Sequence, residues 1–166
     1  MRKITLDLST RDINRAIREL RQYKRDIKRK VDLLVQTLTD LGVDIAKAQI
    51  QEMGAWYTGE LESSISGYFS PTVGVGVVKA GSPYAIYVEF GIGLVGESAP
   101  HPLASSLWAY NIPSEHKDET GGWWYYNDRD NRLHYTHGFQ SRPFMYNTAR
   151  ELEKECVRVA REVFAK

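Results

Sequence analysis

The sequence predicts an α+β protein in which a long N-terminal helix and a C-terminal helix pack on a small, mostly antiparallel sheet, with an aromatic-rich loop insertion. Three observations indicate this class. Apolar residues recur at helical spacing towards both ends of the 166-residue chain. Between them, Val73, Val75 and Val77 alternate with glycines, a pattern typical of a strand. Aromatic, turn-forming and charged residues then mix over residues 93–140, which predicts loops and a hairpin.

The first element is predicted as a basic helix over residues 10–50. Its apolar residues recur every three or four positions, close to a heptad, with one gap of seven that spans Tyr23 and Lys24. They are Ile13, Ile17, Leu20, Ile27, Val31, Leu34, Leu38, Leu41 and Ile45. Ser9 and Asp12 predict a capping box at its start, and Gly42 predicts a weak point.

Such a helix is too long for the body of the protein. It would extend for about 60 Å, whereas a domain of this size is about 30 Å across. Part of the helix would therefore project from the body, and its apolar stripe would be exposed to solvent unless another chain covered it. We expect an oligomer for this reason.

The net charge of +1 conceals a basic N-terminal part. Residues 1–30 hold 11 of the 22 lysines and arginines and four acidic residues, a net charge of +7, so the remaining chain carries −6. Seven cations of the predicted helix are candidates for a contact with DNA or an acidic partner: Arg15, Arg18, Arg21, Lys24, Arg25, Lys28 and Arg29. A merely solvated helix face is the alternative, and the sequence leaves both open.

The sheet, a short helix and the loop region are expected within residues 55–140. Residues 60–65 predict one or two helical turns with Leu61 and Ile65 inward. Gly74 and Gly76 leave one face of the following strand bare, so that another segment can approach closely.

The run "YAIYVEFG", residues 84–91, allows two interpretations. Ser82-Pro83 is a typical helix start and Gly91 a typical stop, which predicts a helix over residues 83–90. A strand with alternating faces is the alternative. The helix is preferred because its start and stop signals agree.

Glu89 is the only carboxylate in this apolar run. In a helix it would share a side with Ala85 and Val88, where burial penalises a carboxylate that has no cation or amide donors. We expect a structural role for Glu89. Its expected partners are the side chain of Arg142 or the backbone amides of the loop after Gly91.

The last part of the chain predicts a hairpin and a helix. Residues 122–127 and 133–139 predict two strands joined by a turn over residues 128–131. Residues 141–165 predict a helix with Phe144, Thr148, Leu152, Cys156, Val159 and Val163 on one stripe. Cys156 is therefore expected to be a buried, inert thiol. The length suits one domain, residues 1–166.

The sequence holds no constellation typical of catalysis or cofactor binding. A single cysteine excludes an intramolecular disulfide, and no apolar run is long enough for a secretory signal or a membrane span. His134 and His137 are three apart, which places them on opposite faces of a strand. Nucleophile-elbow, dinucleotide and zinc-protease patterns are missing from the sequence. We therefore expect neither an enzyme nor a bound metal or cofactor.

The motifs "TGELESSI" (residues 58–65), "YAIYVEFGIG" (residues 84–93) and "GFQSRPFM" (residues 138–145) follow one another along the chain. This ordered set resembles the tail-component family of tailed bacteriophages, the lambdoid minor structural proteins of the head–tail junction. In "TGELESSI" the matching residues are Thr58, Gly59, Leu61, Ser64 and Ile65. In "YAIYVEFGIG" they are Tyr84, Ala85, Tyr87, Val88, Glu89, Phe90, Gly91 and Gly93. In "GFQSRPFM" they are Gly138, Gln140, Arg142, Pro143, Phe144 and Met145. Ile92 stands where the family has threonine, and Phe139 separates two residues that are adjacent in the family.

The resemblance implies a non-enzymatic virion protein, similar to tail-completion or neck proteins. Such a protein would form a ring, expected as a hexamer, between the head connector and the tail tube. Its neighbours would be head-connector, tail-terminator or tail-tube proteins, with DNA in the channel and no membrane. It would lie in the virion, and in the host cytoplasm during assembly. A nucleic-acid-binding module using the basic helix is the alternative, and a metal-dependent enzyme using Glu89 or the histidines is the third hypothesis.

Overall fold

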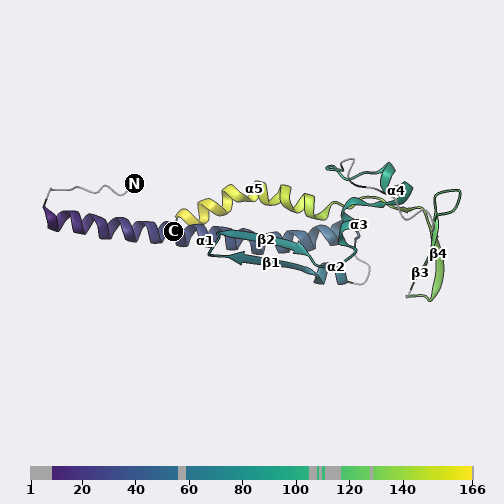
Figure 1. Ribbon diagram of the computed structural model, residues 1–166, viewed down its shortest axis with the longest axis horizontal. Helices are drawn as coiled ribbons and strands as arrows, with labels where there is room; N and C mark the ends of the chain where they lie inside the picture. Colours follow the sequence, from purple (N-terminus) through teal and green to yellow (C-terminus); the bar gives the residue numbers. More distant parts are fainter. Residues whose placement is uncertain are drawn as a thin grey trace.

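The computed structural model describes residues 9–55, 59–104, 108, 110, 117–127 and 129–165. Its elements are α1 (Thr10–Glu52), α2 (Glu60–Ser63), β1 (Ile65–Ser70), β2 (Val75–Ala80), α3 (Ala85–Phe90), α4 (Gly93–Ser98), β3 (Trp123–Asn127), β4 (Arg132–Thr136), β5 (Gly138–Phe139) and α5 (Phe144–Ala165). The fold is α+β, as the sequence predicts, with two small antiparallel sheets instead of one. The molecule is elongated, with the N-terminal part of α1 at one end and the β3–β4 hairpin at the other (Figure 1).

The long helix α1 begins with the predicted capping box. Ser9 Oγ accepts the backbone N–H of Asp12 at 3.2 Å and donates to the Asp12 carboxylate at 3.2 Å. The helix is continuous through Gly42, so the predicted weak point is wrong. A Cβ at Gly42 would lie 2.9 Å from the side chains of both Leu152 and Val78. The glycine instead allows α5 and β2 to pack closely on α1.

The β1–β2 hairpin packs on α1 through its glycines. Gly67 and Gly76 face the helix, and a Cβ at Gly76 would lie 1.9 Å from Oγ1 of Thr39. The predicted close approach is therefore confirmed at Gly76, whereas Gly74 lies in the turn before β2, and a Cβ there would meet nothing within 4 Å. Val75 and Val77 point away from α1 and are exposed, and Val73 lies in the turn before β2. Strand β1 was not predicted, because Gly67 interrupts its apolar pattern.

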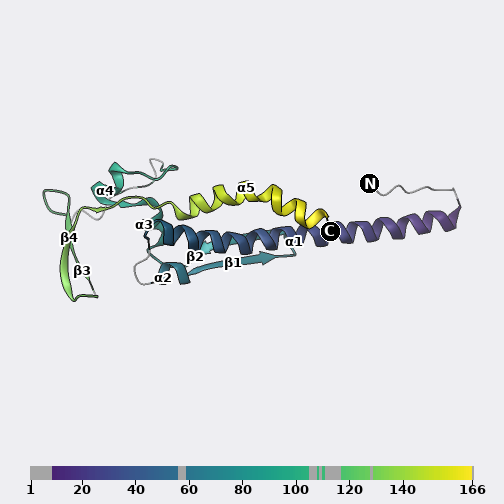
Figure 2. The same ribbon diagram turned by 180° about the vertical axis from the view of Figure 1, so that it is seen from behind.

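The hydrophobic core lies at the C-terminal end of α1, where α2, α3 and the start of α5 meet (Figure 2). Its buried residues are Ala46, Ile50, Ala55, Leu61, Ile65, Ala85, Val88 and Phe144. The inward orientation predicted for Leu61 and Ile65 is confirmed. The three sequence motifs that are far apart in the chain thus contribute to one core.

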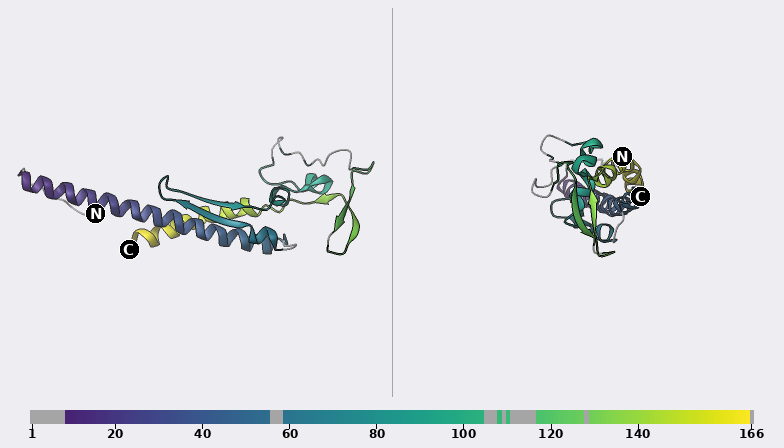
Figure 3. Two further views of the ribbon diagram at one scale, coloured as in Figure 1. Left: turned by 60° about the horizontal axis from the view of Figure 1, so that its bottom comes forward. Right: turned by 90° about the vertical axis from the view of Figure 1, so that its right-hand side faces the viewer.

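Helix α5 runs back along α1 and ends partway along it, so that the N-terminal part of α1 projects beyond the C-terminus (Figures 1 and 3). Near the end of the covered part, Lys30 Nζ donates to the Phe164 carbonyl oxygen at 3.3 Å and Lys28 Nζ donates to the Pro71 carbonyl oxygen at 3.1 Å. The predicted projection of the helix is therefore confirmed. We refer to residues 10–29 as the arm.

The predicted burial of Cys156 is wrong, because the structure places this thiol on an exposed part of α5. Successive steps of four residues from Phe144 each overshoot a helical turn by about 40°. Three such steps carry Cys156 to the edge of the stripe. Val159 and Val163 return to the buried side after a step of three.

The aromatic insertion contains more regular structure than predicted. The β3–β4 hairpin is confirmed, with Trp124 paired to Tyr135 across the strands and Asn131 in the left-handed region at φ 53°. Helix α4 was not predicted. Isolated bridges join Ile92 to Phe139 and Gly93 to Gly138, which connects the segment after α3 to β5. Within the loops predicted over residues 93–140, residues 111–116 lie outside the described residues.

Candidate functional site

The short helix α3 carries Glu89 and is confirmed as a helix, although it begins two residues later than predicted. Ser82 does not cap it. The Ser82 hydroxyl instead donates to Oε1 of Glu60 at 3.3 Å. Gly91 ends the helix at φ 77°, and a Cβ there would lie 2.6 Å from the backbone nitrogen of Ser141. The glycine therefore allows the segment before α5 to lie against the end of α3.

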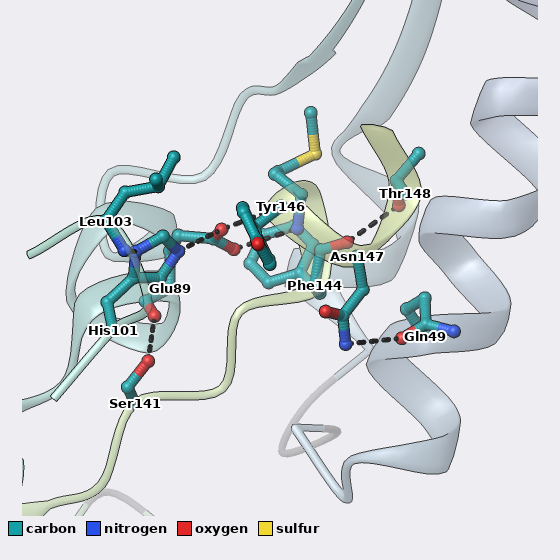
Figure 4. Close-up of polar contacts among 10 residues, drawn as sticks. Gln49, Glu89, His101, Leu103, Ser141, Phe144, Tyr146, Asn147 and Thr148 are labelled. Carbon is teal, nitrogen blue, oxygen red and sulfur yellow. Dashed lines mark hydrogen bonds and ion pairs between the residues drawn. The ribbon is translucent and has the colours of Figure 1, made fainter. Parts of the chain in front are cut away.

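Glu89 is 7% exposed and caps the N-terminus of α5 (Figure 4). Its Oε2 accepts the N–H of Met145 at 2.8 Å, and its Oε1 accepts the N–H of Tyr146 at 2.9 Å. These amides belong to the first turn of the helix and have no partner within it. A carboxylate at this position also interacts favourably with the helix dipole. Pro143, which precedes α5, has no side-chain acceptor, so Glu89 replaces the usual cap from another element.

His101 completes the coordination of Glu89. Its Nε2 lies 3.0 Å from Glu89 Oε1, and its Nδ1 accepts the N–H of Leu103 at 3.0 Å. The accepting Nδ1 leaves the hydrogen on Nε2, which donates to Glu89. The imidazole is 4% exposed and lies between the rings of Phe90 and Tyr146, with centroids at 4.4 and 5.5 Å. We call Glu89, His101 and the two α5 amides the Glu89 junction.

The predicted pairing of Glu89 with the Arg142 side chain is wrong. Arg142 joins the junction only through its backbone N–H, which donates to the Val88 carbonyl at 2.9 Å, and its buried Nε has no hydrogen-bond partner among the described residues. The alternative, amides of the loop after Gly91, is wrong as well, since both amides come from α5. His101 was not predicted as a partner of Glu89, because nothing in its local sequence indicates a contact with a residue twelve positions earlier.

Further contacts fix α5 around the junction. Ser141 Oγ donates to the carbonyl oxygen of Glu89 at 2.7 Å. Asn147 Nδ2 donates to Oε1 of Gln49 at 3.1 Å, which ties α5 to α1 (Figure 4). The junction therefore connects three helices and is surrounded by partners.

The remaining motif residues divide into core and surface groups. Leu61, Ala85 and Phe144 are buried in the core, and Gly59 precedes α2 in the left-handed region at φ 81°. The half-buried residues are Tyr84, Phe90, Arg142 and Pro143, whereas Tyr87 is exposed. Thr58 lies outside the described residues. The structure thus brings the three motifs together in space.

All seven candidate cations of α1 are exposed. Arg15 pairs with Asp12 at 3.0 Å and Lys28 with Asp32 at 2.7 Å. Arg29 lies 3.9 Å from Asp26, and Arg25 donates to Gln22 at 2.6 Å. Arg18, Arg21 and Lys24 have no ion-pair partner in the described part of the chain.

Two hairpin surfaces carry exposed apolar side chains. The face of β1–β2 that points away from α1 presents Tyr68, Val75 and Val77. On β3–β4, one face presents Trp124, Tyr126, Leu133 and Tyr135. Tryptophan and tyrosine are enriched at the energetic centres of protein interfaces. We refer to the first as the valine face and to the second as the aromatic face.

The titratable groups at the base of the β3–β4 hairpin form a local network. The Asp118 carboxylate accepts the Tyr135 hydroxyl at 2.5 Å and the Thr120 hydroxyl at 2.7 Å. These hydrogen bonds, that from Tyr135 foremost, lower the pKa of Asp118 to about 2. The same contact with Asp118 raises the pKa of Tyr135.

No three His, Cys, Asp or Glu side chains gather in a metal-binding arrangement among the residues whose positions are described. His134 pairs with Asp130 at 2.7 Å, and His137 lies 3.3 Å from the hydroxyl of Thr120. His134 and His137 thus each have their own partner.

Comparison of the chain with models of protein families, with curated proteins and with solved structures gives no match. Within the described residues, no helix is both long enough and apolar enough to cross a lipid bilayer.

Proposed function

We propose that this protein is a structural component of a tailed-phage virion, a tail-completion or neck protein at the head–tail junction. The ordered set of three motifs supports this function. Their residues Leu61, Ile65, Ala85, Val88 and Phe144 pack in one core, so the resemblance involves one connected part of the fold. The protein would act in the virion after assembly in the host cytoplasm.

The exposed surfaces of the body support assembly into a ring. A cyclic ring uses two different surfaces on each copy, one for each neighbour. The valine face and the aromatic face provide two such surfaces, each with apolar side chains that are costly to leave in water. We propose that they are covered in a ring of this protein, expected as a hexamer, which would contact head-connector, tail-terminator or tail-tube proteins.

Electron microscopy of a phage that lacks this gene tests the proposal. Full heads and finished tails that remain separate would support a joining function. Normal particles, or a defect limited to DNA replication, would contradict it. A particle reconstruction that contains a single copy of the protein would contradict the ring.

Nucleic-acid binding is the second candidate function, because Arg18, Arg21 and Lys24 have no ion-pair partner among the described residues. Binding of duplex DNA by the full-length chain at several salt concentrations tests it. Phosphate contacts release counterions, so affinity carried by the arm would fall steeply with salt. Loss of binding on replacing these three residues with glutamine would support this function.

A further inference from the structure

The apolar stripe of α1 follows a heptad repeat. Labelling the heptad positions a to g, position a holds Ile17, Lys24, Val31, Leu38 and Ile45, and position d holds Ile13, Leu20, Ile27, Leu34 and Leu41. Repeats with apolar residues at a and d form the seam of coiled coils. Lys24 is the only polar residue at either position over this range.

The two halves of the stripe have different environments. Leu34, Leu38, Leu41 and Ile45 are half-buried where the body packs on α1, and Leu38 lines a groove together with Leu152 of α5. In contrast, Ile13, Ile17, Leu20, Ile27 and Val31 are 39–54% exposed. The same heptad seam therefore continues from the body into solvent.

We propose that the seam of residues 13–31 forms a coiled coil with an amphipathic helix of a different protein, one that carries acidic side chains beside its apolar stripe. Water-exposed seam residues on a helix of this length are costly, and a second helix would bury them. The proposal does not depend on the phage function, because it rests on the seam and on its charges.

The charges beside the seam favour an acidic partner. Arg21 and Lys28 occupy position e, directly beside the apolar residues, and Lys24 lies within the seam. Charged residues at the edges of a coiled coil select the partner through ion pairs across the interface. Arg21 and Lys24 have no ion-pair partner among the described residues, so their charges remain available.

The acidic residues of the arm do not compensate these cations. Asp12, Glu19 and Asp26 recur every seven residues at position c, away from the e side of the seam. Asp12 pairs with Arg15, and Asp26 lies close to Arg29, both on the outer surface of the helix. Lys28 pairs with Asp32 at 2.7 Å, so among the basic residues of the seam Arg21 and Lys24 are the ones left to a partner.

A second copy of this arm is a poor occupant. In a parallel pair, Lys24 of one helix would face Lys24 of the other within the seam. In an antiparallel pair, the two basic e sides would face each other. Residues 9–30 hold nine lysines and arginines against three acidic residues, so two arms would also repel over their whole length. The ring contacts proposed for the body do not require the arms to pair.

Binding of designed helical peptides to the full-length chain tests the inference. One probe has isoleucine and leucine at a and d and glutamate at e and g, and its matched control has lysine at e and g. We expect fluorescence anisotropy to show that the acidic peptide binds at least about ten-fold more tightly, with an affinity that falls as salt rises. Equal affinities for the two peptides would overturn the proposal.

Paired variants locate the binding site. Leu20→Ser removes a seam residue, whereas Leu33→Ser removes an exposed leucine outside the seam. We expect only Leu20→Ser to weaken binding of the acidic peptide by about ten-fold or more. Likewise, Lys24→Glu should weaken binding of the acidic peptide. Arg15→Glu, which lies on the outer surface of the helix, should not weaken it. Circular dichroism checks that each variant keeps its helix content, and equal effects within either pair would contradict a seam contact.

Sedimentation velocity distinguishes a partner helix from a second copy. We expect the association state of the full-length chain to be the same for the native protein and for Leu20→Ser. Self-association that Leu20→Ser abolishes would show that the seam pairs with itself, and the proposal would be wrong.

Discussion

Oε1 of Glu89 lies 3.0 Å from Nε2 of His101, and both side chains are buried. This contact explains how an apolar helix can contain a carboxylate. The two α5 amides and the imidazole N–H together donate three hydrogen bonds to it, which offset the loss of hydration. The carboxylate thereby links α3, the segment around residue 101 and the start of α5.

Replacing Glu89 should therefore destabilise the protein strongly. Glu89→Ala leaves one buried donor and two half-buried donors without an acceptor, and each hydrogen bond to a charged group contributes about 1.5–3 kcal/mol. We expect the free energy of unfolding to fall by about 3 kcal/mol or more, measured by urea denaturation. Glu97→Ala, at an exposed position of α4, is the control and should change it by less than about 0.5 kcal/mol. Similar losses for both variants would contradict the junction.

The same contact predicts energetic coupling between Glu89 and His101. Once Glu89 is alanine, loss of the His101 side chain removes a donor that already lacks its acceptor. The losses for Glu89→Ala and His101→Ala should then differ from additivity by about 1 kcal/mol or more in a double-mutant cycle. The reference pair is Glu89→Ala with Arg142→Ala. The losses in unfolding free energy for these two variants should be additive within about 0.5 kcal/mol. Coupling of Glu89 with Arg142 but not with His101 would contradict this contact and support the ion pair that the sequence predicts.

The helices and one hairpin were predictable because their signals are local. Periodicity predicted both long helices, and Ser9 with Asp12 predicted the start of α1. Strand β1 was missed for a different reason. Gly67 has no side chain to contribute to an alternating pattern, and its role appears only in its close approach to Thr39 and Val43 of α1.

The need of Glu89 for donors was predictable, whereas their identity was not. Burial of a carboxylate in an apolar run requires compensation whatever the fold. Backbone amides carry no sequence signal, so Met145 and Tyr146 could not be singled out. The absence of a side-chain acceptor at Pro143, within the first turn of the helix predicted over residues 141–165, was a signal that another element would supply the cap.

The exposure of Cys156 predicts a reactive thiol in the folded protein. Access to solvent and the thiolate fraction control the reaction of cysteine with disulfide reagents. We expect Cys156 to react with a chromogenic aromatic disulfide at a rate comparable to that of the urea-unfolded chain. Reaction that begins only on unfolding would show a buried thiol. Cys156→Ser, which leaves no cysteine in the sequence, is the blank.

The Asp118 network predicts a titration at unusually low pH. Since its folded pKa of about 2 lies below the ordinary 3.8, the carboxylate stabilises the folded hairpin above about pH 4, and this contribution is lost as pH falls towards 2. We expect NMR of the Asp118 carboxyl carbon to give a midpoint near 2. Tyr135→Phe removes the strongest hydrogen bond and should raise the midpoint towards 3.8. An unchanged midpoint in this variant would contradict the contact.

The packing of Gly76 against Thr39 predicts that adding a single methyl group at Gly76 destabilises the protein. A Cβ on Gly76 would lie 1.9 Å from Thr39 Oγ1, and this hydroxyl is held by its hydrogen bond to the Val35 carbonyl at 2.8 Å. Gly76→Ala must therefore displace β2 from α1 or break that bond. We expect it to lower the free energy of unfolding by about 1–3 kcal/mol, measured by urea denaturation.

Making Gly76→Ala in a Thr39→Ala protein as well distinguishes this steric effect from a general cost of altering the strand. Thr39→Ala removes the hydroxyl that the new Cβ would meet, while alanine remains a strong helix former in α1. Gly76→Ala should then cost less in the Thr39→Ala protein than in the native one, by about 1 kcal/mol or more. The strand carries the same substitution in both backgrounds. If Gly76→Ala lowers the free energy of unfolding equally in both, Thr39 does not limit how closely β2 approaches α1.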